Sequence, residues 1–388
     1  MSGYRDHGVL RTYSAPDRRA IQPMSQLSVR EFPDFDRSGV KMTAPDADET
    51  LSFYDDRWLC AWARAFLPDR GWARPLTVYS VVSGDTTLGY FGLAQQTLSR
   101  LRVRSLAGYY WPFRTMAVCD DDDNRQAFAT SVAKHFSRSP PATVLRFGPV
   151  SSLDKAIGAL LRSLIGNGWT ALRRDDGQSF VLKLPEEVAA FESGISHSLL
   201  KNVRYCRRRM EKQFGSVGIQ RYVLGPESDE ALDIVGAIEN ASWISKEHGD
   251  LKFVGAANRK FWTSLGAAPE QRYQAVIWIL RCDTVPVAFS AHLETLETIY
   301  IIANSYDERW KPHSPGSVLS LELLSDACRR GKKQVDWGQG DSGYKSRWGA
   351  VPSACLFDVM LFRPGIRGHL MRTLAQRFLP AWHVLEHV

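Results

Sequence analysis

The residues from Ser314 to Gly349 read SPGSVLSLELLSDACRRGKKQVDWGQGDSGYKSRWG. This order predicts a Ser-Pro-Gly turn, an apolar helix, a short strand and a glycine-rich segment. Gly338, Gly340 and Gly343 have the G-x-G-x-x-G spacing of dinucleotide sites, which also require a helix at the third glycine and an acidic residue about twenty positions later. Here YKSRWGAVP follows Gly343, and its glycine and proline leave no room for a helix. The sequence therefore argues against a dinucleotide site.

The helix in this stretch begins just after a predicted strand, TIYIIANSY at 298–306. The first N–H groups of a helix are unpaired, and the helix dipole adds about half a positive charge, so such a terminus favours anions. The residues expected to hold an anion are Ser314, Gly316, Ser317 and Val318. Three basic residues just before them favour a phosphate: Arg309, Lys311 and His313. In the simpler alternative, Ser314 only caps the helix and Gly316 only makes the turn.

The composition is typical of a soluble globular protein with a sizeable core. The 388 residues are 44% hydrophobic, and this length favours two domains. No run of about eighteen apolar residues occurs, and residues 1–20 have no continuous apolar segment, so we expect neither a membrane span nor a signal peptide. Six cysteines without a C-x-x-C pair argue against zinc and disulfides and fit a cytoplasmic location. The net charge of +7 indicates an anionic partner.

The pattern of apolar residues divides the chain into four parts. Residues 1–45 are expected to form a polar arm, 46–185 and 186–365 two lobes, and 366–388 a C-terminal helix. The first lobe should contain a hairpin around Ser83–Asp85 and a second strand pair around Asp175–Gly177. In the second lobe, three strands should form an antiparallel meander within 272–306. The expected fold class is α/β (α+β), and each lobe should have a mixed, mostly antiparallel sheet flanked by helices.

Five motifs in the second lobe carry a resemblance to a known family. They are NVRYCRRRM at 202–210, ASWISKEHG at 241–249, SPGSVL at 314–319, VDWGQGD at 335–341 and GYK at 343–345. Together with the order of elements from Phe191 to Phe362, they resemble the acetyltransferase-like domain of the cellulose-biosynthesis CelD type, within the GNAT superfamily. The first lobe resembles the degenerate GNAT-like half of two-lobed relatives such as Fem-type peptidyltransferases.

This resemblance implies an acyltransferase whose co-substrate is acyl-CoA, most simply acetyl-CoA. The loop that would bind the pyrophosphate is KPHSPGS at 311–317, in which Pro315 removes one backbone donor. The three glycines at 338, 340 and 343 would lie at the end of the fifth strand of the GNAT fold. There they would form a flexible floor beside the acyl group.

Acyl transfer needs a base for the proton of the nucleophile, an oxyanion donor and an acid for the departing thiolate. Asp341, after the flexible Gly340, is expected to be the base, with a pKa raised by partial desolvation, and Asp336 is the next candidate. Tyr344 would protonate the thiolate, as a tyrosine does in many GNAT enzymes, and Lys345 would bind an anionic group. Alternatively, Asp336 only caps a turn, and Tyr344 is a packed aromatic with a solvated hydroxyl.

Three further residues are expected to bind substrate. Arg204 lies on a predicted helix, Leu199–Phe214, whose basic face would hold an anionic substrate, a nucleotide-linked sugar or a tRNA; a solvated face is the simpler alternative. Trp243 and Lys246 would line the acceptor pocket, or Trp243 is a core residue at a helix end. Glu247-His248 does not form the H-E-x-x-H zinc motif, so no metal is expected.

The residues and the resemblance together predict an N- or O-acyltransferase that acts on a sugar-derived or other small metabolite, in exopolysaccharide biosynthesis. The main alternative is a Fem-like transfer of an amino acid from charged tRNA, in which the basic helix would contact phosphates. A non-catalytic scaffold that keeps the fold without the chemistry is a third interpretation.

Overall fold

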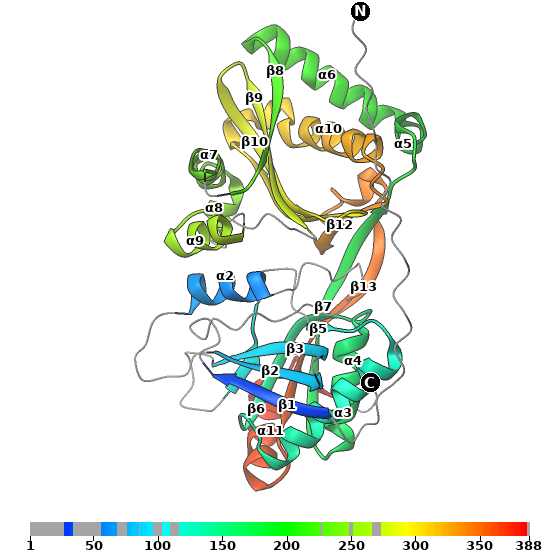
Figure 1. Cartoon of the computed structure of the whole chain (residues 1–388). Coiled ribbons are helices and arrows are strands. Elements are labelled where there is room, and N and C mark those ends of the chain that lie inside the picture. Colours follow the sequence, from blue (N-terminus) through cyan, green and yellow to red (C-terminus); the bar gives the residue numbers. More distant parts are fainter. Residues whose placement is uncertain are drawn as a thin grey trace, which may run out of the picture.

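The computed structural model describes residues 27–33, 56–67, 76–84, 86–95, 103–108, 116–225, 227–247, 251–265 and 273–385. Most of the predicted N-terminal arm and His248 lie outside the described residues. Two lobes are joined by a pair of long strands (Figure 1). Among the described helices, none is both long and apolar enough to cross a bilayer.

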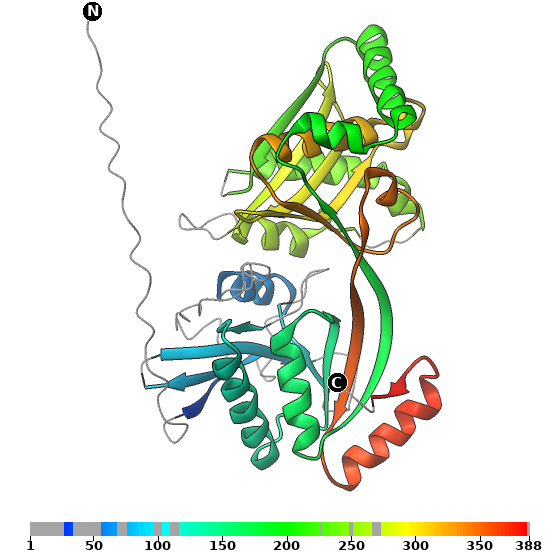
Figure 2. The ribbon, with the colours of Figure 1, turned by 90° about the vertical axis from the view of Figure 1, so that its right-hand side faces the viewer.

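In the N-terminal lobe, α3 and α4 pack on one face of the sheet and α2 packs on the other (Figure 2). Asp121 and Asp154 cap α3 and α4 by accepting hydrogen bonds from first-turn N–H groups, at 2.8 and 3.0 Å. The predicted first hairpin is confirmed, because Ser83 pairs with Thr86. The elements of this lobe are β1 (Leu27–Pro33), α2 (Asp56–Phe66), β2 (Leu76–Ser83), β3 (Thr86–Gln95), β4 (Val103–Leu106), β5 (Ala117–Val118), α3 (Asp122–Arg138), β6 (Val144–Ser151), α4 (Lys155–Gly166) and β7 (Thr170–Lys183).

In the C-terminal lobe, α6 and α10 pack on one face of the sheet, and α7 and α9 pack on the other. The predicted meander is confirmed, because β9, β10 and β11 pair antiparallel in chain order. The elements here are α5 (Val188–Gly194), α6 (His197–Phe214), β8 (Val217–Val223), α7 (Asp229–Asn240), α8 (Trp243–Glu247), α9 (Ala256–Leu265), β9 (Gln274–Cys282), β10 (Val285–Glu294), β11 (Thr298–Tyr306), η3 (Glu308–His313), α10 (Pro315–Arg329), β12 (Gln334–Gln339), η4 (Ser346–Trp348) and β13 (Val351–Phe362). The chain then returns to the N-terminal lobe as α11 (Ile366–Phe378) and β14 (His383–Val384).

The strands of both lobes form one sheet, in the order β1-β2-β3-β4-β6-β13-β7-β12-β11-β10-β9-β8. The pairs β4–β6 and β11–β12 are parallel, and the other neighbours on this path are antiparallel. This confirms the predicted fold class. Strands β7 and β13 run from one lobe into the other and make the two lobes continuous (Figures 1 and 2). Their pairing extends from Thr170 opposite Phe362 to Val181 opposite Val351.

Two sequence expectations need correction. Asp175–Gly177 is not a turn between two strands but lies within the single strand β7. The register of β7 with β13 shifts between Leu356 and Phe357, so β7 has one extra residue at this point. This residue forms a bulge, and Gly177 beside it has a φ of +107°. The expected C-terminal helix is present but ends at Phe378, two residues before Pro380, and β14 then pairs with β7.

The lobes also share a hydrophobic core. Trp58 on α2 is fully buried and meets Phe261 on α9 edge to face, with ring centroids 5.1 Å apart, and Tyr273 at 6.4 Å. The cluster around these rings includes the inner side chains of β2 from one lobe and of β9, β10 and β11 from the other. Burial of such large aromatic surfaces favours one relative position of the two lobes.

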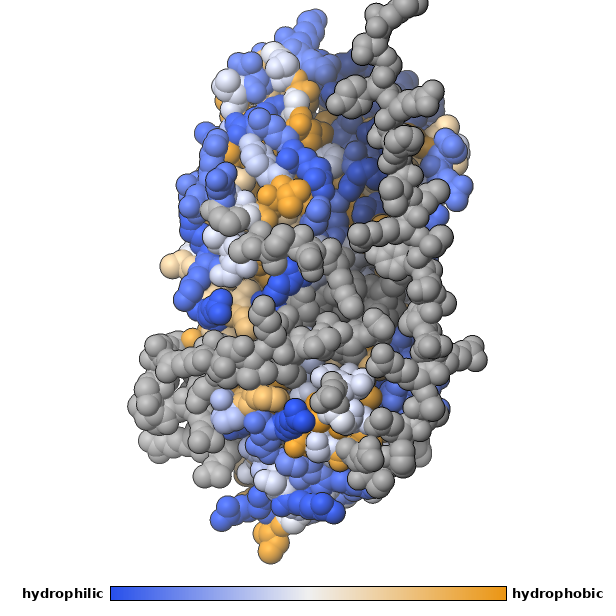
Figure 3. Space-filling view, viewed as in Figure 1, coloured by the Kyte–Doolittle hydropathy of each residue, from blue (hydrophilic) through white to orange (hydrophobic). Residues whose placement is uncertain are grey.

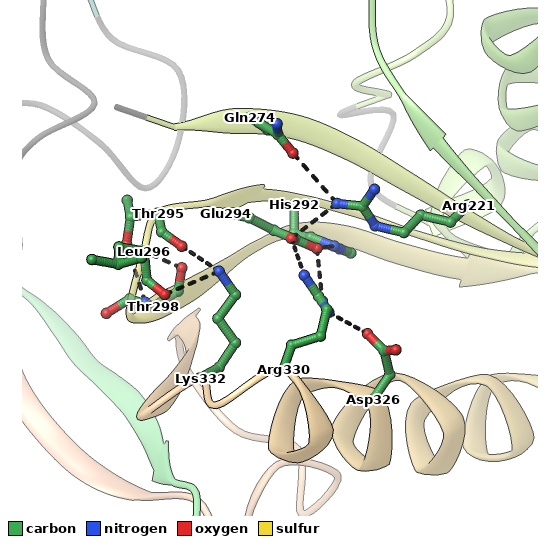
Figure 4. A network of polar contacts seen from close by, with 10 residues as sticks. All are labelled: Arg221, Gln274, His292, Glu294, Thr295, Leu296, Thr298, Asp326, Arg330 and Lys332. Atoms are coloured by element: carbon green, nitrogen blue, oxygen red, sulfur yellow. Dashed lines mark hydrogen bonds and ion pairs between the residues drawn. The ribbon is translucent and has the colours of Figure 1, made fainter. Parts of the chain in front are cut away.

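A buried carboxylate fixes α10 to the sheet. Figure 4 shows Glu294, at the end of β10, which is 4% exposed and accepts hydrogen bonds from Arg330 at 2.5 and 3.1 Å. Arg221 on β8 donates to it at 3.1 Å, and the imidazole of His292 lies 2.8 Å away. Burial alone would raise the pKa of Glu294, but His292 and Arg330 outweigh it and hold this pKa well below its usual range.

Glu294→Gln should lower the free energy of unfolding by about 1–3 kcal/mol, because a neutral amide leaves the half-buried guanidinium groups of Arg221 and Arg330 without a countercharge. Because folding lowers the pKa of Glu294, its contribution is complete above the pKa of the unfolded state and is lost as the pH falls. Urea unfolding should therefore show the difference from wild type shrinking below about pH 4.3. Asp233→Asn, which breaks an exposed pair with Arg259, is the control and should leave stability nearly unchanged.

Candidate functional site

The parallel ladder between β11 and β12 is short. It joins Thr298 to Gln334, Ile299 to Val335, and Tyr300 to Asp336, and no pair follows. Beyond this point β11 continues beside β10, whereas the end of β12 pairs with β7. The C-terminal ends of two adjacent strands therefore separate next to the first turn of α10, and the candidate residues gather there.

The glycines at 338, 340 and 343 shape the segment after β12. Their φ angles are +68°, +68° and +84°, which side chains with a Cβ rarely adopt. Gly340 donates its N–H to the carbonyl oxygen of Gln178 at 2.9 Å, which holds the segment against β7. The short helix η4 begins only at Ser346, so the glycines make successive turns and do not open a long helix.

Asp336 and Lys345 form the charged centre of this region. Val335 and Trp337 are buried in the cluster that includes α10, so the alternation of β12 directs Asp336 to the opposite face. Burial raises the pKa of Asp336, opposed by the N–H of Gly338 at 2.7 Å and the charge of Lys345. Burial also lowers the pKa of Lys345 to about 8, and Asp336 and Asp341 counteract that shift.

The Lys345 ammonium is held in place by backbone acceptors. Its Nζ donates to the carbonyl oxygens of Gly338 at 3.0 Å and Gln339 at 2.7 Å, and lies 5.8 Å from the centre of the Phe180 ring. The lysine therefore closes the glycine-rich segment onto the end of β12 and keeps a positive charge beside Asp336.

Asp341 has a different environment from the one expected. Its carboxylate accepts hydrogen bonds from the N–H groups of Lys345 at 2.8 Å and Ser346 at 3.1 Å, at the start of η4. Burial would raise the pKa of Asp341, but the hydrogen bonds from Ser346 and Lys345 outweigh it, and the pKa lies below its ordinary value. The expected rise in this pKa is therefore wrong, because local backbone donors stabilise the charged form.

Tyr344 connects the segment to α10. Its hydroxyl forms a hydrogen bond with the Oγ of Ser320, which in turn donates to the carbonyl oxygen of Gly316 at 2.8 Å. The ring meets Trp337 edge to face at 5.4 Å. Burial raises the pKa of Tyr344, so the phenol keeps its proton. This position, on the α10 side of β12, fits both a packed aromatic residue and a proton donor.

The first turn of α10 offers fewer backbone donors than expected. The N–H groups of Ser317 and Val318 both donate to the carbonyl oxygen of Ser314, at 3.0 and 3.2 Å, and Pro315 has no N–H. Ser314 donates its own N–H to Lys311. Within the described part of the chain, Gly316 is the residue of this turn whose N–H has no partner. The turn is also strained, because Ser314 has a φ of +49°.

Two predicted acceptor residues lie next to this turn. Lys246 on α8 forms an ion pair with Glu308, and the N–H of Glu308 donates to Ala241 at 3.2 Å. Helix α8 is therefore fixed to η3, which leads into α10. Trp243, the first residue of α8, is 39% exposed and is not a core residue. Both side chains are thus on the surface near the N-terminus of α10.

Arg204 lies elsewhere. Its guanidinium donates to both carboxylate oxygens of Glu192 at 2.8 Å. With residues of α5, α6 and α10 it lines a cavity of about 340 Å³ whose lining includes neither Asp336 nor Lys345. The structure therefore separates Arg204 from Asp336 and Lys345, but Val318, a predicted cofactor-binding residue, lines the same cavity.

The sequence analysis missed Ser320 and Lys252. Ser320 was hidden in an apolar helix, and only its position four residues after Gly316 could have pointed to the turn. Lys252 donates its Nζ to the carbonyl oxygen of Ile302 at 3.0 Å, and its positive charge acts on Lys345. Glu239, which is 1% exposed, holds Lys252 in place by accepting a hydrogen bond from the backbone N–H of Lys252 at 3.0 Å. A buried acid within the apolar run of α7 was the available signal.

Comparison with known proteins finds a family model that matches part of the chain. Residues 197–346 match the family model described as an acetyltransferase (GNAT) domain. No curated protein matches the sequence. The GNAT part of the sequence resemblance is thus confirmed for this region, whereas the narrower cellulose-biosynthesis type remains a prediction.

Solved structures extend the similarity to both lobes. The crystal structure of FemX superposes with a TM-score of 0.56 at 11% identity, covering 89% of this chain and 96% of that one, so the two share a fold. A tandem GNAT protein from the clavulanic acid biosynthesis pathway gives 0.43 at 14% identity, covering 88% and 100%. The C-terminal domain of a putative lysylphosphatidylglycerol synthetase from Agrobacterium fabrum gives 0.45 at 14%, covering 74% and 85%.

Gly316→Val should weaken acyl-CoA binding without unfolding the protein, because a branched side chain would fill the space in front of the free N–H. A Cβ at Gly316 would lie 3.4 Å from Tyr306, an ordinary contact, so the fold should tolerate it. Calorimetric titration should show at least about tenfold weaker binding. Gly218→Val is the matched control, since nothing lies within 4 Å of its Cβ. Unchanged affinity for Gly316→Val would exclude this turn.

Proposed function

We propose that this protein transfers an acyl group from acyl-CoA, most simply acetyl-CoA, to an amine or hydroxyl of a small sugar-derived acceptor. The observation that supports this most directly is the polar cluster of Asp336, Tyr344 and Lys345, which lies where β11 and β12 separate. The acetyltransferase (GNAT) family match over 197–346 contains the whole cluster. A role in exopolysaccharide biosynthesis rests on the sequence resemblance alone.

In this proposal Asp336 is the base and replaces Asp341 in that role. A general base must bind a proton more tightly than an ordinary carboxylate does. The pKa of Asp336 is raised, whereas the pKa of Asp341 is lowered. The positive charge of Lys345 opposes this rise and favours the ionised form of Asp336. Asp341 would then act indirectly, by holding the backbone of Lys345 in position.

The reaction itself is a single displacement. As the acceptor nitrogen or oxygen forms a bond to the thioester carbonyl carbon, its proton passes to the Asp336 carboxylate, and the carbonyl oxygen becomes an oxyanion. The carbon–sulfur bond then breaks, and the Tyr344 hydroxyl gives its proton to the departing thiolate. The proton on Asp336 returns through solvent to the tyrosinate. Ser320, within hydrogen-bond distance of the Tyr344 hydroxyl, orients that proton.

The Gly316 N–H and the cations before α10 would receive the pyrophosphate of the co-substrate. Arg309 is held by Asp307 at 2.5–3.1 Å, yet its side chain is 83% exposed, so it can reach an anion. Lys311 is exposed on the same short helix, η3. Trp243 and Lys246 would contact the acceptor from α8, on the neighbouring surface.

A specific observation also supports the second candidate, aminoacyl transfer from tRNA. Lys201, Arg208 and Lys212 are exposed on α6, and such a basic face can contact phosphates. The fold shared with FemX over both lobes is compatible with this candidate as well as with the first.

Thermal-shift titration should separate these functions. We expect acetyl-CoA to raise the melting temperature, because a ligand present at a hundred times its Kd stabilises the folded state by about 2.7 kcal/mol. Stabilisation by tRNA but not by acetyl-CoA would favour the second candidate, and stabilisation by neither would favour a non-catalytic scaffold.

Asp336→Asn should lower kcat by about 10²- to 10⁴-fold, the usual effect of removing a base, and should remove the acidic limb of the pH–rate profile. In wild type this limb should lie above the usual carboxyl range, since burial raises the pKa of Asp336. Tyr344→Phe should lower kcat with little change in acyl-CoA affinity. Asp341→Asn is the matched control and should retain most of the activity with the acidic limb in place. If Asp341→Asn lowered kcat more than Asp336→Asn did, the base would be Asp341 and not Asp336.

A further inference from the structure

Helix α11 exposes a row of large apolar side chains. Ile366 is 88% exposed, Leu370 57% and Phe378 70%, and Leu374 between them is 41% exposed. Residues spaced by four lie along one side of a helix, so the four form a continuous strip. Leu379 and Val384 follow the helix and are also exposed. Such a patch on a folded protein indicates a binding surface.

The strip is not the side of α11 that packs on the protein. Met371 and Ala375 face inward, against a cluster of Val144, Leu172, Phe362 and Trp382. Gly368 is buried, where the chain turns back near Arg363. The helix therefore has two apolar sides, and the inner one already anchors it to β7 and β13.

The charged side chains of residues 363–385 are all basic. Between Arg363 and Leu385 the sequence contains no Asp or Glu, but four arginines and two histidines: Arg363, Arg367, Arg372, Arg377, His369 and His383. Arg367 and Arg377 are exposed beside the apolar strip. A helix with exposed Leu, Ile and Phe next to arginine has the composition of one that lies in the interface of an anionic membrane.

The length and place of α11 fit this composition. At 13 residues the helix is about 20 Å long, too short to cross a bilayer but long enough to lie along its surface. It lies on the outside of the N-terminal lobe, at the end of the molecule opposite α6 and α10 (Figures 1 and 2). At that end of the same view, Figure 3 shows apolar atoms that project beyond a hydrophilic surface.

We propose that α11 is a membrane-surface anchor that binds anionic phospholipid. Ile366, Leu370 and Phe378 enter the boundary between headgroups and acyl chains, and Arg367 and Arg377 contact lipid phosphates. The candidate functional site lies in the other lobe and shares no residue with the anchor. The inference does not depend on the reaction that the protein catalyses.

The test is flotation of the full-length protein with vesicles of phosphatidylcholine alone or with added phosphatidylglycerol. Wild type should float with the anionic vesicles, and less so as salt rises. Ile366→Ser/Leu370→Ser/Phe378→Ser should lower the partition coefficient at least about tenfold. Arg367→Gln/Arg377→Gln should lower it about tenfold on anionic vesicles only. The matched control is Leu153→Ser/Leu296→Ser, two exposed leucines outside α11, which should bind as wild type does.

Circular dichroism should show that the triple variant is folded. A folded triple variant that binds vesicles as well as wild type does would overturn the proposal. So would a wild type that does not float with anionic vesicles. Light scattering tests whether the strip on α11 binds a second copy of the chain. A wild-type dimer that becomes a monomer in the triple variant, without vesicle binding, would assign the strip to self-association.

Discussion

The pairing of β7 with β13 is the constraint on which the rest of the structure depends. Each strand belongs to both lobes, since β13 also pairs with β6 and β7 also pairs with β12. Asp358, fully buried on β13, is held by Arg146 on β6 at 2.9 Å and Arg174 on β7 at 2.5 Å. Because a buried carboxylate is stabilised by these two cations, the ion pairs favour the register in which the three strands are paired.

The candidate site inherits its geometry from this pairing. Strand β12 lies between β7 and β11, and Asp336 is the last residue that touches both, opposite Val181 and Tyr300. Gly340 then follows β7 and not β11. Strand β12 therefore separates from β11 because it remains paired with β7. Strand β7 comes from the first half of the chain.

Local signals in the sequence were sufficient for much of this. The apolar period predicted α6, α10 and the meander, and the clustered Asp, Tyr and Lys in and after β12 predicted where polar groups collect. Contacts between distant residues were not predictable in the same way. Asp-Asp-Gly in β7 reads as a turn because bulges and turns favour the same residues. The opposite pKa shifts of Asp336 and Asp341 depend on backbone donors and on burial, which spacing along the chain does not specify.

The shared strands have a consequence for how the chain matures on the ribosome. A first half ending at residue 185 leaves β6 and β7 with bare edges on the sides that β13 occupies in the finished sheet. Translation must proceed to Phe362 before that gap can close, so the sheet of the N-terminal lobe is completed only after the strands of the C-terminal lobe have been synthesised. Until then the open edges of β6 and β7 can pair with any extended strand.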